Sequence, residues 1–420
     1  MKIERKNDGE RNFMKINHIK YIILSVLHNT AILFSSGAIV QTFFLTMGVS
    51  AERVSVYASL VQVIQVAAMC FCLFFGDGVK NIKKFLTVLF FIFPVIFISE
   101  LAVLIFGIGG AGRIYGVVLI GSIVSNFALG LYNIICYKMP YFIMDMRDYG
   151  KLGSVSGILS GSIGIGATAL LSFFVKNYNY QIVMSVAFSI GTVLWLGAAL
   201  VNHSYRVKDP ESLPHVPENR LRAVVEVLKH PLFYKTAVPH ILRGVGVGIL
   251  SLAVVIGTSD GILNTKTSTY MTVFTSLATI VGYVLYLLTE KFFRIGNTLA
   301  AFGILMVVLL PFMTVFKNLI VFYIVYFSGY TLLTVVNMCV PMLVYECVPY
   351  EMMGTYTSLR MMIFTLGQAL PGFFMNGLFS LIGTFGVMIL TGGCFAVSSV
   401  WFTLVLKKKE PKEKQADAVK

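Results

Sequence analysis

Long apolar runs alternate with short polar breaks along almost the whole chain. Each run holds about twenty residues or more, which lets an α-helix cross a hydrocarbon core of about 30 Å. Because backbone groups in lipid must hydrogen-bond within their own segment, we expect each run to be a helix. The pattern predicts an all-α transmembrane protein with twelve spans, at 21–47, 52–76, 84–108, 113–138, 152–175, 179–202, 232–258, 266–289, 293–316, 318–344, 354–382 and 384–406.

One long polar segment, at residues 203–230, divides these spans into six and six. It contains three prolines and then an amphipathic stretch at 221–228, whose apolar face suits the membrane surface. The predicted organisation is a cytoplasmic N-terminal tail (1–20), an N-terminal six-helix half (21–202), a cytoplasmic linker (203–230), a C-terminal six-helix half (231–406) and a basic cytoplasmic C-terminal tail (407–420).

Two matches between the halves indicate an internal repeat. Residues 140–149, after span four, share the positions of a proline, an acid and a tyrosine with residues 341–350, after span ten. His28 in span one falls on His240 in span seven when the first half is shifted by 212 residues. Six-helix repeats joined by a cytoplasmic linker are the layout of major facilitator transporters, so we expect that twelve-helix fold with two pseudo-symmetric halves.

Basic residues gather on one side of the predicted spans, which sets the expected orientation. The side with both termini holds 26 of the 33 Lys and Arg residues, the other side keeps five, and Arg243 and Arg360 lie inside spans. We therefore expect a multi-pass plasma-membrane protein (the cytoplasmic membrane if the source is bacterial) with both termini in the cytoplasm. The bias also accounts for the net charge of +14 without a nucleic-acid partner, and Lys407–Lys409 suit anionic lipid head groups.

The segment Met144–Gly153, with the sequence MDMRDYGKLG, resembles the loop between spans four and five of the glycoside–pentoside–hexuronide:cation symporters, a branch of the major facilitator superfamily. Residues 44–50 also resemble the first external turn of that family. The resemblance implies transport of sugars with H⁺, Na⁺ or Li⁺, and relatives carry lysolipids. The chain departs from the family at 61–68, where acidic cation ligands are replaced by apolar and amide residues, and at Thr365, where the family has a lysine.

Ionisable residues inside spans are costly and tend to face a cavity or a partner. Arg243, near the middle of span seven, is expected to contact an anion or to pair with an acid. His240 lies one turn earlier on the same face, and His28 has the matching place in span one; each is either a functional group or a hydrogen-bonded structural histidine. Arg360, only a turn or two into span eleven, is expected to snorkel to the surface.

Glu100 is the one carboxylate well inside a predicted span, and either it carries a proton or it bonds to a neighbouring helix as a neutral acid. We therefore predict proton coupling through Glu100 and His240. Amide side chains offer donors and acceptors to a polar solute, although each alone also suits a helix–helix bond. The predicted substrate-binding set is His28, Asn29, Gln62, Gln65, Asn133, His240, Arg243, Asn337 and Gln368.

Acidic residues in the cytoplasmic loops are predicted to form a gate. Asp77, Asp145, Asp148 and Glu346 lie beside basic residues there, and ion pairs between the halves are expected to favour an outward-open state. Span five carries Gly153, Gly157 and Gly161 at four-residue spacing, which is typical of close helix packing.

The sequence contains no catalytic constellation, phosphate-binding loop or cysteine spacing of a metal site, so we expect neither enzyme activity nor a cofactor or metal. The predicted function is secondary active transport of a small polar solute, sugar-like or an organic anion, by alternating access with H⁺ or Na⁺. Export of amphipathic or lipid-like compounds is the second interpretation, and a non-transporting receptor or lipid scramblase is a third. The expected partners are the solute, the coupling ion and membrane lipids, and we expect a monomer.

Overall fold

The computed structural model describes residues 2–35, 38–75, 79, 81–106, 111–136, 139, 143–144, 146–207, 220–268, 270–348 and 350–406, and the account below concerns these. Nearly all of them lie in helices. The helices are α1 (Lys2–Ser35), α2 (Ala38–Thr46), α3 (Ala51–Phe75), α4 (Ile82–Ile105), α5 (Ala111–Ile135), α7 (Met146–Asn177), α8 (Tyr180–His203), α9 (Arg220–Lys229), α10 (Pro231–Ser251), α11 (Ala253–Ser259), α12 (Thr265–Ser268), α13 (Tyr270–Phe292), α14 (Ile295–Leu309), α15 (Phe312–Val315), α16 (Leu319–Cys347) and α17 (Tyr350–Val405).

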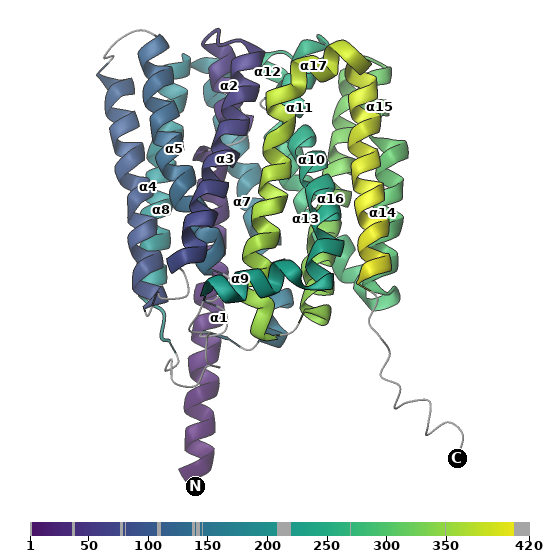
Figure 1. The fold of residues 1–420 in the computed structure, drawn as a ribbon. Coiled ribbons are helices and arrows are strands. Elements are labelled where there is room, and N and C mark those ends of the chain that lie inside the picture. Colours follow the sequence, from purple (N-terminus) through teal and green to yellow (C-terminus); the bar gives the residue numbers. More distant parts are fainter. Residues whose placement is uncertain are drawn as a thin grey trace.

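The long helices run side by side in one bundle (Figure 1). In the described part of the chain, nine helices are long and apolar enough to cross a membrane, and the bent pair α10–α11 makes ten. Large apolar side chains point outward from this bundle; Val95 is 68% exposed and Leu381 80%. Such a surface needs lipid around it, so the chain is a multi-pass membrane protein.

The twelve predicted spans each correspond to helix, but several differ in detail. Span seven is broken, because α10 and α11 meet at an angle of 51° beside Leu252. Span nine ends early at Leu309, and the short α15 follows Pro311, whose ring removes a backbone donor. Spans eleven and twelve are continuous in α17 except at Gly383, where φ of 66° and ψ of 173° reverse the chain.

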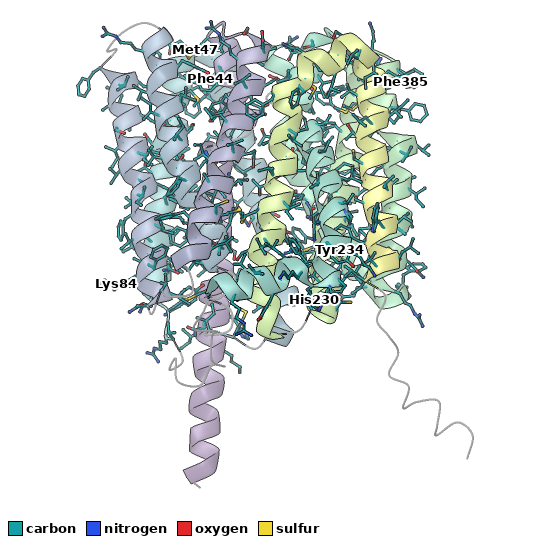
Figure 2. All side chains as sticks on the ribbon, viewed as in Figure 1. Phe44, Met47, Lys84, His230, Tyr234 and Phe385 are labelled. Atoms are coloured by element: carbon teal, nitrogen blue, oxygen red, sulfur yellow. The ribbon has the colours of Figure 1, made fainter. Side chains whose placement is uncertain are left out.

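The bundle has two distinct ends. Lys84, His230 and Tyr234 lie at the end where α1 begins and α9 lies across the helices, whereas Phe44, Met47 and Phe385 lie at the opposite end (Figure 2). The first end corresponds to the side that the loop charges assign to the cytoplasm, and it is called the predicted cytoplasmic end below. The predicted N-terminal tail is not an irregular segment, since α1 already begins at Lys2.

Within the N-terminal half, α1 packs against α7 and α8, α4 against α5 and α8, and α3 against α5. In the C-terminal half, α10 and α14 pack against α17, and α13 and α14 pack against α16. The halves meet where α3 contacts α17 and where α7 contacts α13. Each half therefore has its own helix packing, and these two helix pairs make the most extensive contacts between the halves.

The linker is held at both of its described ends. Asn17, fully buried in α1, donates its amide to the carbonyls of Ile143 (3.2 Å) and Arg206 (2.8 Å), which ties the residues after α8 to the N-terminal half. At the other end of the linker, α9 packs against α10, α17 and α3. Its Val227 is buried in an apolar cluster with Phe233 and Tyr356 of the C-terminal half. Because α3 belongs to the N-terminal half, α9 touches both halves.

Candidate functional site

The predicted site residue His28 lies in an aromatic cluster inside the N-terminal half. Its ring centroid is 4.5 Å from that of Tyr132, 5.1 Å from that of Trp195 and 6.0 Å from that of Phe90. These partners come from α5, α8 and α4, and they bury His28 to 8% exposure. Among the described residues, neither Nδ1 of His28 nor Nε1 of Trp195 has a hydrogen-bond partner.

The neighbouring Asn29 differs from His28 because its side chain is exposed. Its amide donates to Ser160 Oγ of α7 at 3.4 Å. Asn337, in the middle of α16 in the other half, is exposed as well. The predicted residues Gln62 and Asn133 of the N-terminal half and Gln368 of the C-terminal half are half-buried. Asn29, Asn133 and Asn337 belong to spans one, four and ten, so the predicted polar set is spread over both halves.

A buried polar seam joins α3, α4 and α5. Gln65 donates its amide to Asn126 Oδ1 at 2.7 Å, and Tyr57 and Ser122 share a hydroxyl hydrogen bond of 2.8 Å. Gln65 therefore makes a helix–helix bond, which is the second of the two roles that the sequence allowed for it beside substrate binding.

Glu100 lies at this seam and is 3% exposed. Its carboxylate packs against Gly121 of α5, where an added Cβ would lie 2.9 Å from the Glu100 carboxyl carbon. Glu100 Oε2 has no hydrogen-bond partner among the described residues. One oxygen of this acid is therefore buried without a hydrogen-bond partner in the described part of the chain.

A second cluster of ionisable residues lies inside the C-terminal half. His240 is 2% exposed, Arg360 4% and Arg243 7%, and His240 lies within electrostatic reach of both arginines. The His240 ring meets the edge of Phe402 at 4.6 Å, and the Arg243 guanidinium lies over the ring of Phe364 at 4.5 Å. Two cations and an imidazole are thus enclosed by helices α10 and α17.

The register of α10 against α17 brings these residues together. The two helices run in parallel here, and the Thr236 and Tyr356 hydroxyls share a hydrogen bond of 2.6 Å. One turn further along, the same register places His240 level with Arg360. Beyond them the helices come very close, because a Cβ on Gly244 would meet the Phe364 carbonyl oxygen at 2.2 Å. Glycine at this position permits the approach that encloses the cluster.

The expectation for Arg360 is wrong. The sequence placed it near the membrane surface, but α17 begins at Tyr350 and Arg360 lies well inside the helix, with its side chain buried. Its Nε has no hydrogen-bond partner among the described residues. The hydrogen bond between Thr236 and Tyr356 sets the register of α10 against α17, and this register places Arg360 beside His240. The sequence alone does not show this register.

Some of the described contacts between the halves lie toward the predicted external end. Thr42 of α2 and Ser268 of α12 share a hydroxyl hydrogen bond of 3.3 Å. In the α3–α17 contact, a Cβ on Gly372 would meet Ser59 Oγ at 2.0 Å. In the α7–α13 contact, a Cβ on Gly164 would meet Ser276 Oγ at 2.6 Å. The halves are therefore closely apposed at this end.

Two of the three glycines that the sequence singled out in span five lie in a close helix contact. Cβ atoms on Gly157 and Gly161 would meet the side chains of Tyr283 and Ile280 in α13 at 2.1 and 2.5 Å. Gly153 has open space around it. The first two positions thus allow α7 and α13 to pack closely across the halves.

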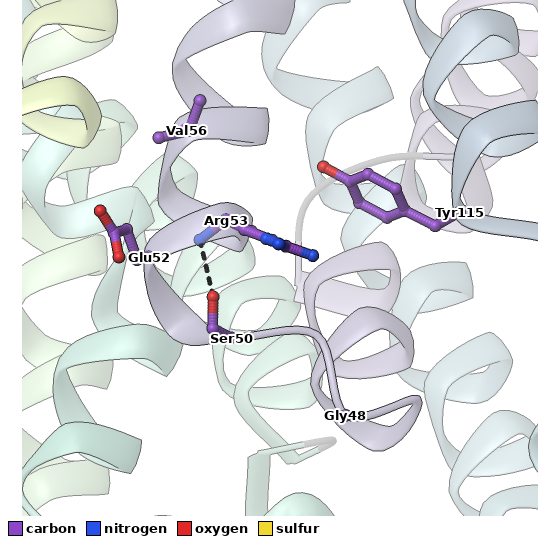
Figure 3. Close-up of a pocket in the computed structure, with 6 residues that line it drawn as sticks. All are labelled: Gly48, Ser50, Glu52, Arg53, Val56 and Tyr115. Atoms are coloured by element: carbon purple, nitrogen blue, oxygen red, sulfur yellow. Dashed lines mark hydrogen bonds between the residues drawn. The ribbon is translucent and has the colours of Figure 1, made fainter. Parts of the chain in front are cut away.

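A cavity of about 530 Å³ opens at the predicted external end (Figure 3). It is lined by Gly48, Ser50, Glu52, Arg53, Val56 and Tyr115. The Arg53 side chain extends toward Tyr115 and away from Glu52 (Figure 3). The cavity contains none of the predicted site residues, and it lies between the α2–α3 turn and the start of α5.

The predicted cytoplasmic gate lies outside what the structure describes. Asp77 and Asp145 are not among the described residues, and the side chains of Asp148 and Glu346 are not described. Within the described part of the chain, the one ion pair is between Arg222 and Glu226, on the exposed surface of α9. No group of three His, Cys, Asp or Glu residues that could hold a metal occurs in that part either.

The chain is similar in fold to solved transporter structures. It aligns with the E. coli fucose:proton symporter FucP at 11% identity and a TM-score of 0.68, over 94% of this chain and 100% of that chain. The chain has the major facilitator fold. It is also similar to a variant of the nucleoside transporter NupG (14% identity, TM-score 0.66, 93% and 100% covered) and to a D-xylose–proton symporter (10%, 0.66, 96% and 99%).

No protein-family profile matches the chain, and no curated protein sequence matches it. At these identities the likeness establishes the major facilitator fold with its two six-helix halves. These similar structures are of two sugar–proton symporters and a nucleoside transporter.

Proposed function

We propose that this chain is a secondary active transporter that moves a small polar solute by alternating access. The observation that carries the proposal is a contact between the halves at the predicted external end together with amide side chains that are exposed within the spans. The halves are apposed at the predicted external end through Thr42 and Ser268, while Asn29 and Asn337, within predicted spans one and ten, remain exposed. A polar surface at that depth suits a solute pathway, because the bilayer disfavours it on a lipid-facing helix.

In this proposal the exposed amides face a pathway that opens to the cytoplasm. Both termini lie in the cytoplasm, because basic residues outside the spans concentrate at that end. The membrane is the plasma membrane, or the cytoplasmic membrane of a bacterium. Closure at this end would then rest on the predicted gate of Asp77, Asp145, Asp148 and Glu346.

Coupling to H⁺ is the second part of the proposal. Glu100 is the one buried acidic residue among those described, and its Oε2 lacks a partner. Ionisable residues inside membrane spans are costly and are typical of proton pathways. Opening of the external contacts would expose the seam of α3, α4 and α5 to water and allow proton exchange there.

Uptake by the purified full chain in liposomes tests the proposal. Radiolabelled glucose, a nucleoside, succinate and glycerol phosphate are offered outside under an inward proton gradient. Accumulation of one class above its equilibrium level, and its collapse on adding a protonophore, is the expected result. Accumulation that needs Na⁺ and ignores the protonophore would replace H⁺ by Na⁺, and absence of accumulation for every class would contradict the proposal.

Export of amphipathic compounds is the second candidate, favoured by the aromatic cluster of His28, Tyr132, Trp195 and Phe90. Ring faces and a single imidazole suit a ligand with an apolar body and one polar group. Extrusion of a fluorescent lysolipid from inverted vesicles under a proton gradient, without concentrative uptake of any polar solute, would favour this candidate. Lipid equilibration with no driving force would instead indicate a scramblase.

A further inference from the structure

We propose that His240, Arg243 and Arg360 form an anion-binding site inside the C-terminal half, and that the transported solute is a small organic anion with a carboxylate or phosphate group. The proposal rests on the transport function above and names the chemical class of its substrate. It differs from the solutes named for the similar structures, which are neutral sugars and nucleosides.

Arg360 is a buried cation inside the C-terminal half. Its guanidinium is enclosed, at 4% exposure, and its Nε has no hydrogen-bond partner. The ion pair between Arg222 and Glu226 is the only one that the described residues contain, and it lies on the surface. A buried charge without a counter-ion is strongly unfavourable, so a protein keeps such a residue where a ligand can supply the missing charge.

His240 points to the same conclusion independently. It is 2% exposed, and neither Nδ1 nor Nε2 has a hydrogen-bond partner among the described residues. A neutral imidazole carries one donor and one acceptor, and leaving both unused inside a protein costs stability. Two arginines lie within electrostatic reach of His240, which can donate one N–H to an anion held between them.

Two acids of the C-terminal half have side chains that the structure describes, Asp260 and Glu290. Asp260 follows α11, near the predicted external end, and Glu290 is exposed near the end of α13. Neither forms an ion pair with Arg360 in the described part of the chain. Arg360 therefore has no counter-ion among the described residues.

The surroundings suit an oxyanion with a small body. Guanidinium groups present parallel N–H donors that match two oxygens of a carboxylate or phosphate. Phe364 lies under Arg243 and holds the plane of its guanidinium. Tyr356 and Thr236 add hydroxyls one turn toward the predicted cytoplasmic end. A neutral sugar would satisfy the hydroxyls but would leave the charge of Arg360 unpaired.

Thermal unfolding of the purified full chain tests the site directly. Succinate, glycerol phosphate and inorganic phosphate are titrated at constant ionic strength set with NaCl, with glucose as the neutral control. A ligand that binds only the folded state raises the unfolding midpoint in a saturable way. We expect at least one organic anion to do so and glucose to leave the midpoint unchanged. Saturation by inorganic phosphate but by no organic anion would overturn the substrate class.

Arg360→Gln is the decisive variant, with Arg294→Gln as a matched control, since Arg294 is exposed at the start of α14. Arg360→Gln is expected to weaken anion binding by about a hundredfold, because one member of a buried charge pair is lost. Without ligand its midpoint should equal or exceed that of the wild type, since an unpaired buried charge has been removed. Arg294→Gln should change neither quantity.

Unchanged anion affinity in Arg360→Gln would overturn the anion site. If the unliganded midpoint of that variant were also lower than that of the wild type, Arg360 would have a purely structural role. If Arg360→Gln fails to fold, Arg360→Lys keeps the charge and removes the paired donors. Arg360→Lys should bind the anion more weakly than the wild type and Arg294→Gln do, without losing binding completely. Wild-type affinity in Arg360→Lys would again contradict the site.

The anion site and the transport function fail in different ways. Saturable anion binding that depends on Arg360, without accumulation of any solute in liposomes, would contradict transport and leave the site standing. Concentrative uptake of a neutral solute at the wild-type rate in Arg360→Gln would contradict the site and leave transport standing.

Discussion

Enclosure without a partner distinguishes Glu100 from the described carboxylates at the protein surface. Replacement by Gln keeps the shape of the protonated acid and removes its ability to exchange a proton, so Glu100→Gln should fold normally. We expect exchange of labelled for unlabelled solute across the liposome membrane to continue, while accumulation driven by a proton gradient falls to the equilibrium level.

The control for this prediction is Glu52→Gln, an exposed acid at the predicted external end. It should accumulate solute as the wild type does. Proton-driven accumulation by Glu100→Gln at the wild-type level would show that the coupling group lies elsewhere. Loss of both exchange and accumulation would assign Glu100 to the structure of the α3–α4–α5 seam.

Single residues also show what a sequence can and cannot reveal about this site. His240 and Arg243 were recognisable because ionisable groups inside apolar runs are rare. Arg360 was misjudged, because its depth depends on where α17 begins and its neighbours depend on the register with α10. The aromatic partners of His28 come from three helices far apart in the sequence, and no local pattern connects them.

Among the helices, the α3–α17 pair joins the two halves and depends on Gly372. An added Cβ there would lie 2.5 Å from the Ser55 carbonyl oxygen, and backbone cannot move aside as a flexible side chain can. Overpacking of this kind costs about 1–3 kcal/mol, and it acts only in the state in which the helices touch. Gly372→Ala should therefore shift the population toward a state that is open at the predicted external end.

Labelling of Thr42→Cys with a membrane-impermeant maleimide, in a background without other cysteines, measures this shift. Thr42 is 6% exposed in the closed contact, so labelling should be slow, and Gly372→Ala should accelerate it about tenfold, the effect of about 1.4 kcal/mol. Gly377→Ala is the matched control, because Gly377 lies in the same helix with open space around it. Equal labelling rates in the two alanine variants would contradict the role of this contact.

Helix boundaries show the same division between local and long-range information. Run length and charge predicted all twelve spans, because lipid imposes its thickness on every one of them. The break at Leu252 was not predicted, because no proline lies there. In the structure the Ser251 hydroxyl donates to the Gly248 carbonyl oxygen, and bonds of this kind often bend helices. At Gly383 the sequence indicated a boundary, and the positive φ supplies its geometry.

For the whole molecule, the two histidines that coincide under the predicted repeat have similar surroundings. His28 meets the edge of Trp195 in span six, and His240 meets the edge of Phe402 in span twelve. The halves have diverged around this shared position. Aromatic rings enclose His28, whereas His240 has two arginines within electrostatic reach. Of these two matching positions, only the one in the C-terminal half therefore has cationic side chains beside the histidine.

Alternating access requires the halves to separate at the predicted external end in every cycle. Thr42 and Ser268 lie on opposite halves, and their hydroxyl oxygens are 3.3 Å apart in the closed contact. Cysteines at both positions should therefore be close enough for a disulfide to form after a small adjustment. We expect oxidation of Thr42→Cys/Ser268→Cys to abolish concentrative uptake and a reductant to restore it.

Each single cysteine variant, treated with the same oxidant, is the control and should keep its uptake. The cross-link leaves the predicted cytoplasmic end free, so binding of solute from that side should persist in the oxidised protein while uptake is lost. That combination is specific to a carrier whose two ends open in turn. Full uptake by protein shown to be cross-linked would mean that solute crosses without separation of the halves, and alternating access through this contact would then be excluded.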